Sequence, residues 1–138
     1  MEIKNKNLLY PKLSYVLNGI FFKAHNDLGR FRNEKQYADA IERLLQDKKI
    51  EYVREYHLSK SFDGEAKNRN IVDFLVESKI ILEIKAKTMV SREDYYQLRR
   101  YLSSTNCELG IIVNFRRRQL VPKRVLNTSL FKRDYSEY

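Results

Sequence analysis

The sequence contains few of the residues that cross-link a chain or interrupt its regular structure. Its 138 residues include one cysteine, four glycines and two prolines. Because Cys107 stands alone, the chain can form neither an internal disulfide nor a cysteine zinc cluster. A chain of this length can bury a core without such cross-links. We therefore expect one globular domain over residues 1–138, with disorder limited to the ends.

Long apolar runs are also absent. No run approaches the roughly 20 residues of a membrane-spanning helix, and residues 1–15 lack the apolar stretch of a signal peptide. These absences predict a cytoplasmic protein that has no membrane partner.

Negative charge is in deficit. The chain has 18 Asp and Glu against 27 Lys and Arg, which gives a net charge of +9 and a pI near 9.6. Such a balance favours a polyanionic partner, chiefly through phosphate contacts. The basic residues gather at 67–69, at 99–100 and in a basic C-terminal segment over 116–138. For any one of these clusters, a solvated surface is an equally good explanation.

Apolar periodicity and turn signals divide the chain into seven elements. A helical stripe ends at Gly29, a typical C-terminal cap, and Asn33 is a plausible N-cap for a second helix. Ser91 begins a capping box that starts a third helix. Because the last strand follows this crossover helix, we expect it to lie parallel to the strand before the helix. The predicted fold is α/β, a mixed sheet flanked by helices in the order ααβββαβ, with helices over about 13–28, 34–45 and 91–102 and strands over about 50–58, 70–76, 80–87 and 109–115.

The two central strands carry charges within apolar runs, in IVDFLVESKIILEIKAK at 71–87. If residues 77–79 form a hairpin loop, the numbers of paired residues add to 156 and Asp73 lies directly opposite Glu83. Two facing carboxylates repel unless a cation or a shared proton relieves them. The same register gathers seven apolar residues on one face, and a slip of one residue would break that face. These residues are Val72, Phe74, Val76, Ile80, Leu82, Ile84 and Ala86.

Facing carboxylates at this position have a chemical use. Asp73 and Glu83 would offer hard oxygen ligands of the kind that Mg²⁺ prefers, and Mg²⁺ retains water that can be activated against a phosphate ester. Lys85 projects from the same face two residues after Glu83, where it would neutralise charge in the transition state. The alternative is that Lys85 only pairs with one of the two acids on a solvent-exposed sheet face.

The chain has an acid, Asp73, and then an acid-x-Lys motif, Glu83-Ile84-Lys85, on the next predicted strand. This pattern resembles the motif of the PD-(D/E)xK nuclease superfamily. Over about residues 8–128, the chain also resembles the small bacterial proteins of the GxxExxY family, which is placed in that superfamily. The segments that carry this resemblance are AHNDLGR at 24–30, EKQYADA at 34–40, NIVDFLVE at 70–77, IILEIKAK at 80–87, DYYQLRRYL at 94–102 and LGIIVNF at 109–115.

The resemblance implies a restriction-endonuclease-like core and a nuclease that uses Mg²⁺ or Mn²⁺ on DNA or RNA. It implies that Asp73 and Glu83 hold the metal, with Glu34 as a candidate third acid and the carbonyl of Ile84 as a further ligand. Gln97 resembles a glutamine that some members place near the active site. A helix N-terminal carboxylate that favours the dipole explains Glu34 equally well, and a plain surface residue explains Gln97.

The chain departs from the family pattern at the turn before the second helix. Glu34 and Tyr37 are kept, but Phe31 stands where the pattern has its first glycine, so this turn must differ.

Two functions of different classes remain. The first is a metal-dependent nuclease, which the intact set of Asp73, Glu83 and Lys85 favours. The second is a non-catalytic nucleic-acid-binding or protein-interaction module, since a nuclease fold does not establish activity. In either case a homodimer with two-fold symmetry is the expectation for a small protein.

Overall fold

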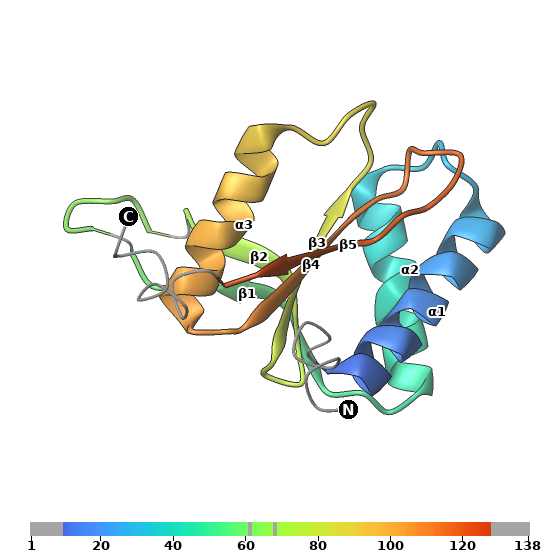
Figure 1. Ribbon diagram of the computed structural model, residues 1–138, viewed down its shortest axis with the longest axis horizontal. Coiled ribbons are helices and arrows are strands. Elements are labelled where there is room, and N and C mark those ends of the chain that lie inside the picture. The colour runs from blue at the N-terminus through green and yellow to red at the C-terminus, as the bar shows by residue number, and fades with distance from the viewer. Residues whose placement is uncertain (1–9, 61, 68, 128–138) are drawn as a thin grey trace, which may run out of the picture.

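Within residues 10–60, 62–67 and 69–127, which the computed structural model describes, the chain forms three helices and a five-stranded mixed sheet (Figure 1). The strands lie in the order β1-β2-β3-β4-β5, with β3 parallel to β4 and the other neighbours antiparallel. Helices α1 and α2 cover one face of the sheet and α3 covers the other, so the predicted α/β fold with a restriction-endonuclease-like core is confirmed. The elements are α1 (Pro11–Leu28), α2 (Glu34–Asp47), β1 (Tyr52–His57), β2 (Ile71–Val76), β3 (Ile80–Lys85), α3 (Arg92–Thr105), β4 (Leu109–Asn114) and β5 (Lys123–Leu126).

Local signals set the helix boundaries as predicted. Asn33 Oδ1 accepts a hydrogen bond from Gln36 N at 2.9 Å, and the Gln36 side chain accepts one from Asn33 N at 3.0 Å. Ser91 and Asp94 form the same reciprocal box at the start of α3. Gly29 follows the last residue of α1 with a φ of 79°. None of the described helices combines the length and the apolar character that crossing a bilayer requires.

The hairpin of β2 and β3 has the predicted register. Glu77 and Ser78 adopt positive φ angles of 53° and 56° in the turn, and Lys79 N donates to Val76 O at 2.9 Å. Strand β4 runs parallel to β3, as the crossover helix predicts. The hairpin pairs are Val76 with Ile80, Leu75 with Ile81 and Phe74 with Leu82.

Strand β5 is absent from the predicted order. It pairs with β4 at the edge of the sheet, and Arg124 within it donates to Ser14 Oγ of α1 at 2.7 Å. Four residues, two of them basic, are too few to give a periodic signal. Part of the predicted basic C-terminal segment therefore belongs to the sheet, and residues 128–138 lie outside the described residues.

The apolar residues form one cluster on each face of the sheet, and they correct one prediction. Phe74 packs beneath α1 and α2, but Val72 packs with the residues beneath α3. Because alternate residues of a regular strand share a face, the regular alternation of β2 must break at Asp73. The expectation that Val72 shares the face of Phe74 is therefore wrong.

Strand β1 has a matching irregularity across from Asp73. Glu55 has a positive φ of 53°, and its neighbours Arg54 and Tyr56 pair with the residues on either side of Asp73. Tyr52 and Tyr56 belong to different apolar clusters, as Phe74 and Val72 do in β2. In both strands, the side chains on either side of the level of Asp73 thus pack on opposite faces of the sheet, where regular alternation would place them on the same face.

Candidate active site

Strands β2 and β3 pair as far as Leu82 and then part. Beyond this point the N–H groups that point toward β2 are those of Ile84 in β3 and of Ala86 just after it, because alternate groups of an extended segment point to the same edge. Ile84 N donates to Asp73 Oδ2 at 2.6 Å, and Ala86 N donates to Glu34 Oε2 at 3.2 Å. Two carboxylates therefore satisfy backbone donors that the carbonyls of a neighbouring strand would satisfy in a continuous ladder.

The predicted pair of acids lies at this parting. Glu83 is only 6% exposed, and its Oε2 is buried without a hydrogen-bond partner in the described structure. Burial, and then the charge of Asp73, raises the pKa of Glu83 to about 9. Burial also raises the pKa of Asp73, although the Ile84 N–H opposes that rise. At neutral pH Glu83 therefore holds a proton that hydrogen-bonds Asp73, which relieves the repulsion expected between facing carboxylates.

Glu34 and Ile84 line the same pocket as Asp73. The pocket has a volume of about 280 Å³ and lies between the start of α2 and the parting of β2 from β3. Among the described residues, no three Asp, Glu, His or Cys side chains lie close enough together to hold a metal ion. The structure thus brings Asp73 and Glu83 together and places Glu34 at the pocket that Asp73 lines, where the N–H of Ala86, just after β3, holds its carboxylate. The other lining residues are Lys35, Ala38, Arg54 and Glu55.

Lys85 has an acidic partner that the sequence analysis missed. Its Nζ lies 3.8 Å from Asp94 Oδ1, and Lys87 Nζ lies 2.6 Å from Asp94 Oδ2. Burial acts to raise the pKa of Asp94, but hydrogen bonds from Lys87 and from Ser91 N outweigh it and hold that pKa below its usual value. The capping box was the only sequence signal at Asp94, and it predicts a helix start rather than a partner for lysines.

Helix α3 turns a tyrosine toward the acids. Tyr101 is 6% exposed, and burial followed by the charge of Glu83 raises the pKa of its hydroxyl. Its apolar stripe predicts packing and gives no signal of this electrostatic contact. Gln97 lies one turn earlier, half-buried on the same side of the helix. In the described structure Gln97 makes no hydrogen bond to Asp73 or Glu83.

Asn114, at the end of β4, fixes the segment that follows β3. Its Nδ2 donates to Lys87 O at 2.7 Å, and its Oδ1 accepts from Lys87 N at 3.1 Å. Asn114 is 6% exposed. A polar residue within the apolar run GIIVNF, at 110–115, was the signal that could have identified it.

The residues at the parting fit a hard divalent cation. Asp73 and Glu83 supply carboxyl oxygens, and the carbonyl of Ile84 points to the same strand edge as its N–H. Oxygen ligands of this kind suit Mg²⁺, which keeps several of its own waters. Because buried polar atoms are nearly always hydrogen-bonded, the unpartnered Oε2 of Glu83 is best explained as an oxygen kept for a ligand.

Comparison with known proteins agrees with this geometry. No curated protein matches the chain. A family model described as the PD-(D/E)XK nuclease superfamily matches residues 11–125, which include every described helix and strand except the last residue of β5. The match spans most of the chain and contains both strands that carry Asp73 and Glu83. The chain therefore belongs to the PD-(D/E)XK nuclease superfamily.

Proposed function

We propose that the protein is a nuclease that hydrolyses phosphodiester bonds in nucleic acid and uses Mg²⁺ or Mn²⁺. The observation that carries this proposal is the buried carboxyl group of Glu83, which has an unpartnered oxygen and lies beside Asp73 where β2 and β3 part. A purely structural role would leave no reason to bury this group without a cationic partner. Membership of the nuclease superfamily supports the same conclusion.

In this proposal Asp73, Glu83 and the carbonyl of Ile84 hold the metal. The cation would polarise the scissile phosphate and lower the pKa of a water. Glu83 would have to release its proton to solvent in order to hold the cation, since the proton and the cation compete for the same oxygens. Glu34, which lines the same pocket as Asp73, is proposed as a third acid of the site.

Lys85 is proposed to stabilise negative charge on the phosphate in the transition state. Its ion pair with Asp94 keeps the ammonium group at the site before substrate binds. Gln97, on the side of α3 that carries Tyr101, is proposed to orient the substrate. We also propose the finer assignment to the GxxExxY family, which rests on the retained Glu34 and Tyr37.

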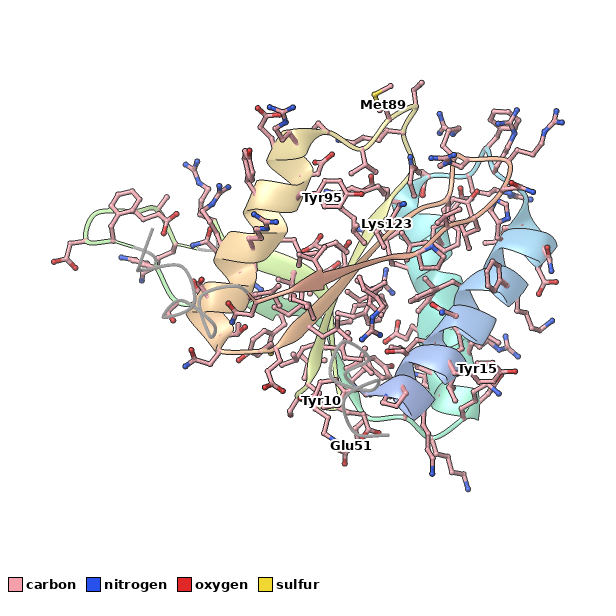
Figure 2. The ribbon with its side chains drawn as sticks, in the orientation of Figure 1. Tyr10, Tyr15, Glu51, Met89, Tyr95 and Lys123 are labelled. Carbon is pink, nitrogen blue, oxygen red and sulfur yellow. The ribbon has the colours of Figure 1, made fainter. Side chains whose placement is uncertain are left out.

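Cleavage assays with a matched acid control test this function. Single-stranded and double-stranded DNA and RNA are incubated with the protein in Mg²⁺, in Mn²⁺ or in EDTA. We expect Glu83→Gln to lower the cleavage rate about a hundredfold or more, and Glu51→Gln to leave it unchanged. Glu51 is exposed just before β1. It lies at the opposite end of the molecule from Met89, which belongs to the loop after β3 (Figure 2). Cleavage that persists in EDTA and in Glu83→Gln would refute the site.

A non-catalytic nucleic-acid-binding module is the second candidate. The observation in its favour is that no three acids converge among the described residues. Salt-sensitive binding of nucleic acid, combined with no cleavage under any metal condition, would support this module instead of the nuclease.

A further inference from the structure

The loop between α1 and α2, residues 29–33, presents an aromatic ring to solvent. It leads directly into Glu34, which lines the pocket of Asp73 and Ile84, here called the acid pocket. Phe31 is 73% exposed and lies three residues before Glu34, which lines that pocket. Phe31 stands where the resembled family has a glycine. Phe31 does not have a positive φ. The residue of this turn that does is Gly29. The altered turn thus places a large apolar side chain at the surface without backbone strain.

The core of the protein holds this loop in place. The hydroxyl of Tyr37 donates to Gly29 O at 2.5 Å and accepts from Arg32 N at 3.3 Å, so its two hydrogen bonds bracket Phe31. Tyr37 is fully buried, and its ring stacks on Phe115 with centroids 4.3 Å apart. Because the backbone that carries Phe31 is held in this way, the loop loses little conformational entropy when the Phe31 ring binds a ligand.

Two guanidinium groups lie over the Phe31 ring. The Cζ atoms of Arg30 and Arg116 are 4.7 Å and 5.7 Å from its centroid. Arg30 Nη1 donates to Arg116 O at 3.2 Å, and Arg116 Nε donates to Arg30 O at 3.0 Å. These bonds join the α1–α2 loop to the β4–β5 loop, residues 115–122, at the end of the molecule where β3 also ends (Figure 1).

Within the part of the chain that the structure describes, no carboxylate forms an ion pair with the cations around Phe31. The hydrogen bonds of Arg30 and Arg116 go to carbonyl groups, as does that of Arg32 to Leu28 O. Elsewhere on the surface, Lys23 pairs with Asp27 at 3.1 Å. Among the described residues, six cations of this region form no ion pair with a carboxylate: Arg30, Arg32, Lys35, Arg116, Arg117 and Arg118.

We propose that Phe31 and these cations, here called the Phe31 platform, bind single-stranded nucleic acid. A base stacks on the Phe31 ring while neighbouring phosphates contact the arginines. Bases inside a duplex are already stacked on one another, so only an unpaired base can use the ring. The inference rests on the proposed function for one point, that the bound strand is the substrate of the acid pocket.

The combination of features selects this ligand over a simple packing role. A single exposed phenylalanine is common and needs no explanation. Here a buried tyrosine holds the backbone on either side of Phe31, guanidinium groups flank the ring, and the cations around it form no ion pair among the described residues. A polyanion that carries flat apolar groups satisfies all three conditions, and Lys35 extends the charge to the wall of the acid pocket.

Binding of short labelled oligonucleotides, measured by fluorescence anisotropy in EDTA, tests the Phe31 platform. The probes are a single-stranded DNA, a single-stranded RNA of the same sequence and the corresponding DNA duplex. We expect Phe31→Ala to weaken single-strand binding about tenfold and Phe31→Trp to restore it. Duplex binding should change less than twofold. The DNA and RNA probes decide which nucleic acid the platform prefers.

Phe62→Ala is the matched control. The loop between β1 and β2 lies on the side of the molecule opposite α1 and α2 (Figure 1), and Phe62 in this loop is 63% exposed. Each variant must melt within about 2 °C of the wild type, so that lost binding is not lost folding. Equal effects of Phe31→Ala and Phe62→Ala, an equal loss of duplex binding, or no binding of any single strand would overturn the proposal.

The same experiment separates this proposal from the proposed nuclease. Because EDTA prevents metal-dependent cleavage, binding to the Phe31 platform is measured without catalysis. Glu51→Gln, the control acid, should bind single strands as the wild type does. Single-strand binding that depends on Phe31, with no cleavage by the wild type in Mg²⁺ or Mn²⁺, would support the platform and reject the nuclease. Cleavage by the wild type, with no effect of Phe31→Ala on binding, would support the nuclease and reject the Phe31 platform.

Discussion

Arg54 and Asp73 line one pocket, and the fold treats the acids grouped with each of them in opposite ways. Arg54 of β1 pairs with Asp39 at 2.7 Å and with Glu42 at 2.8 Å on α2. Hydrogen bonds from Tyr52 and then Arg54 lower the pKa of Glu42. We call these four residues the Arg54 cluster. Among the described residues, Asp73 of β2 and Glu83 of β3 form no ion pair, and burial raises the pKa of both.

The difference separates acids that stabilise the fold from acids that are available for a ligand. In the Arg54 cluster the protein provides each carboxylate with its own cation or hydroxyl. At Asp73 and Glu83 the nearest cation, Lys85, pairs with Asp94 instead. The two groups should therefore respond in opposite directions to pH, since one needs its acids charged and the other holds a proton.

The largest expected effect is at Glu83. Between the usual pKa of a glutamate, 4.5, and the folded value of about 9, the folded protein binds one more proton than the unfolded chain. Its free energy of unfolding should therefore fall as pH rises through this window, by up to about 1.4 kcal/mol per pH unit. Glu83→Gln should remove this slope and be the more stable protein at pH 8.

Urea unfolding in EDTA from pH 5 to pH 9 measures this effect. The difference between the wild type and Glu83→Gln isolates Glu83 from the other titrating groups. Parallel curves for the two proteins would contradict a raised pKa at this site. Added Mg²⁺ should stabilise the wild type at pH 8 and not the variant.

The next effect is at Arg54, whose side chain is 18% exposed. Arg54→Met should lower the free energy of unfolding by about 1–3 kcal/mol at pH 7, because it leaves Glu42 and Asp39 without their cation. Since the folded pKa of Glu42 is lowered, the stability it provides is present above its unfolded pKa and is lost as pH falls through the folded value. The cost of Arg54→Met should accordingly shrink in acid.

Arg43→Met on the exposed surface of α2 is the control for this measurement. It should change stability by less than about 0.5 kcal/mol at either pH. An equal cost for both arginine variants would mean that the Arg54 cluster contributes nothing beyond surface charge.

A smaller effect is expected at Asp94, which has a helix-capping role and an ion-pairing role. Asp94→Asn keeps an acceptor for Ser91 N but loses the charge that holds Lys85 and Lys87, so a cost of about 0.5–1 kcal/mol is expected. Asp94→Ala also loses the cap and should cost about 1 kcal/mol more. Thermal melts in low and high salt distinguish the roles, because only the ion-pair contribution should weaken in salt.

The smallest effect is at Asp73. Asp73→Asn should stabilise the metal-free protein by less than about 1 kcal/mol at pH 10, where Glu83 has lost its proton, because the amide retains an acceptor for Ile84 N and removes a charge beside Glu83. The gain should vanish at pH 5, where Glu83 is protonated in both proteins. Unfolding in urea at the two pH values checks this, and a loss of stability at pH 10 would instead indicate that the Asp73 charge is required by the fold.

Features that depend on neighbours along the chain could be predicted from the sequence. Asn33 and Ser91 identify the starts of α2 and α3, and the three-residue turn fixes the hairpin register. That register was enough to bring Asp73 and Glu83 together. Each of these features depends on residues within a few positions of one another.

Features that depend on distant segments were missed. The period-two rule fails at Val72 because the strand changes the face it presents at Asp73, where its pairing with β3 ends. Asp94, Tyr101 and Asn114 reach the site from α3 and β4, so no local spacing marks them. Short β5 is defined by its pairing with β4 more than by its own residues.

The buried hydroxyl of Tyr37 has a consequence for local opening of the chain. Surface loops usually exchange their amide hydrogens through small fluctuations that leave the core intact. The amide of Arg32 instead donates to a side chain packed against Phe115, so it can be released only if that packing opens. Its deuterium uptake should therefore be as slow as that of α2, which would make this loop part of the same cooperative unit as the core.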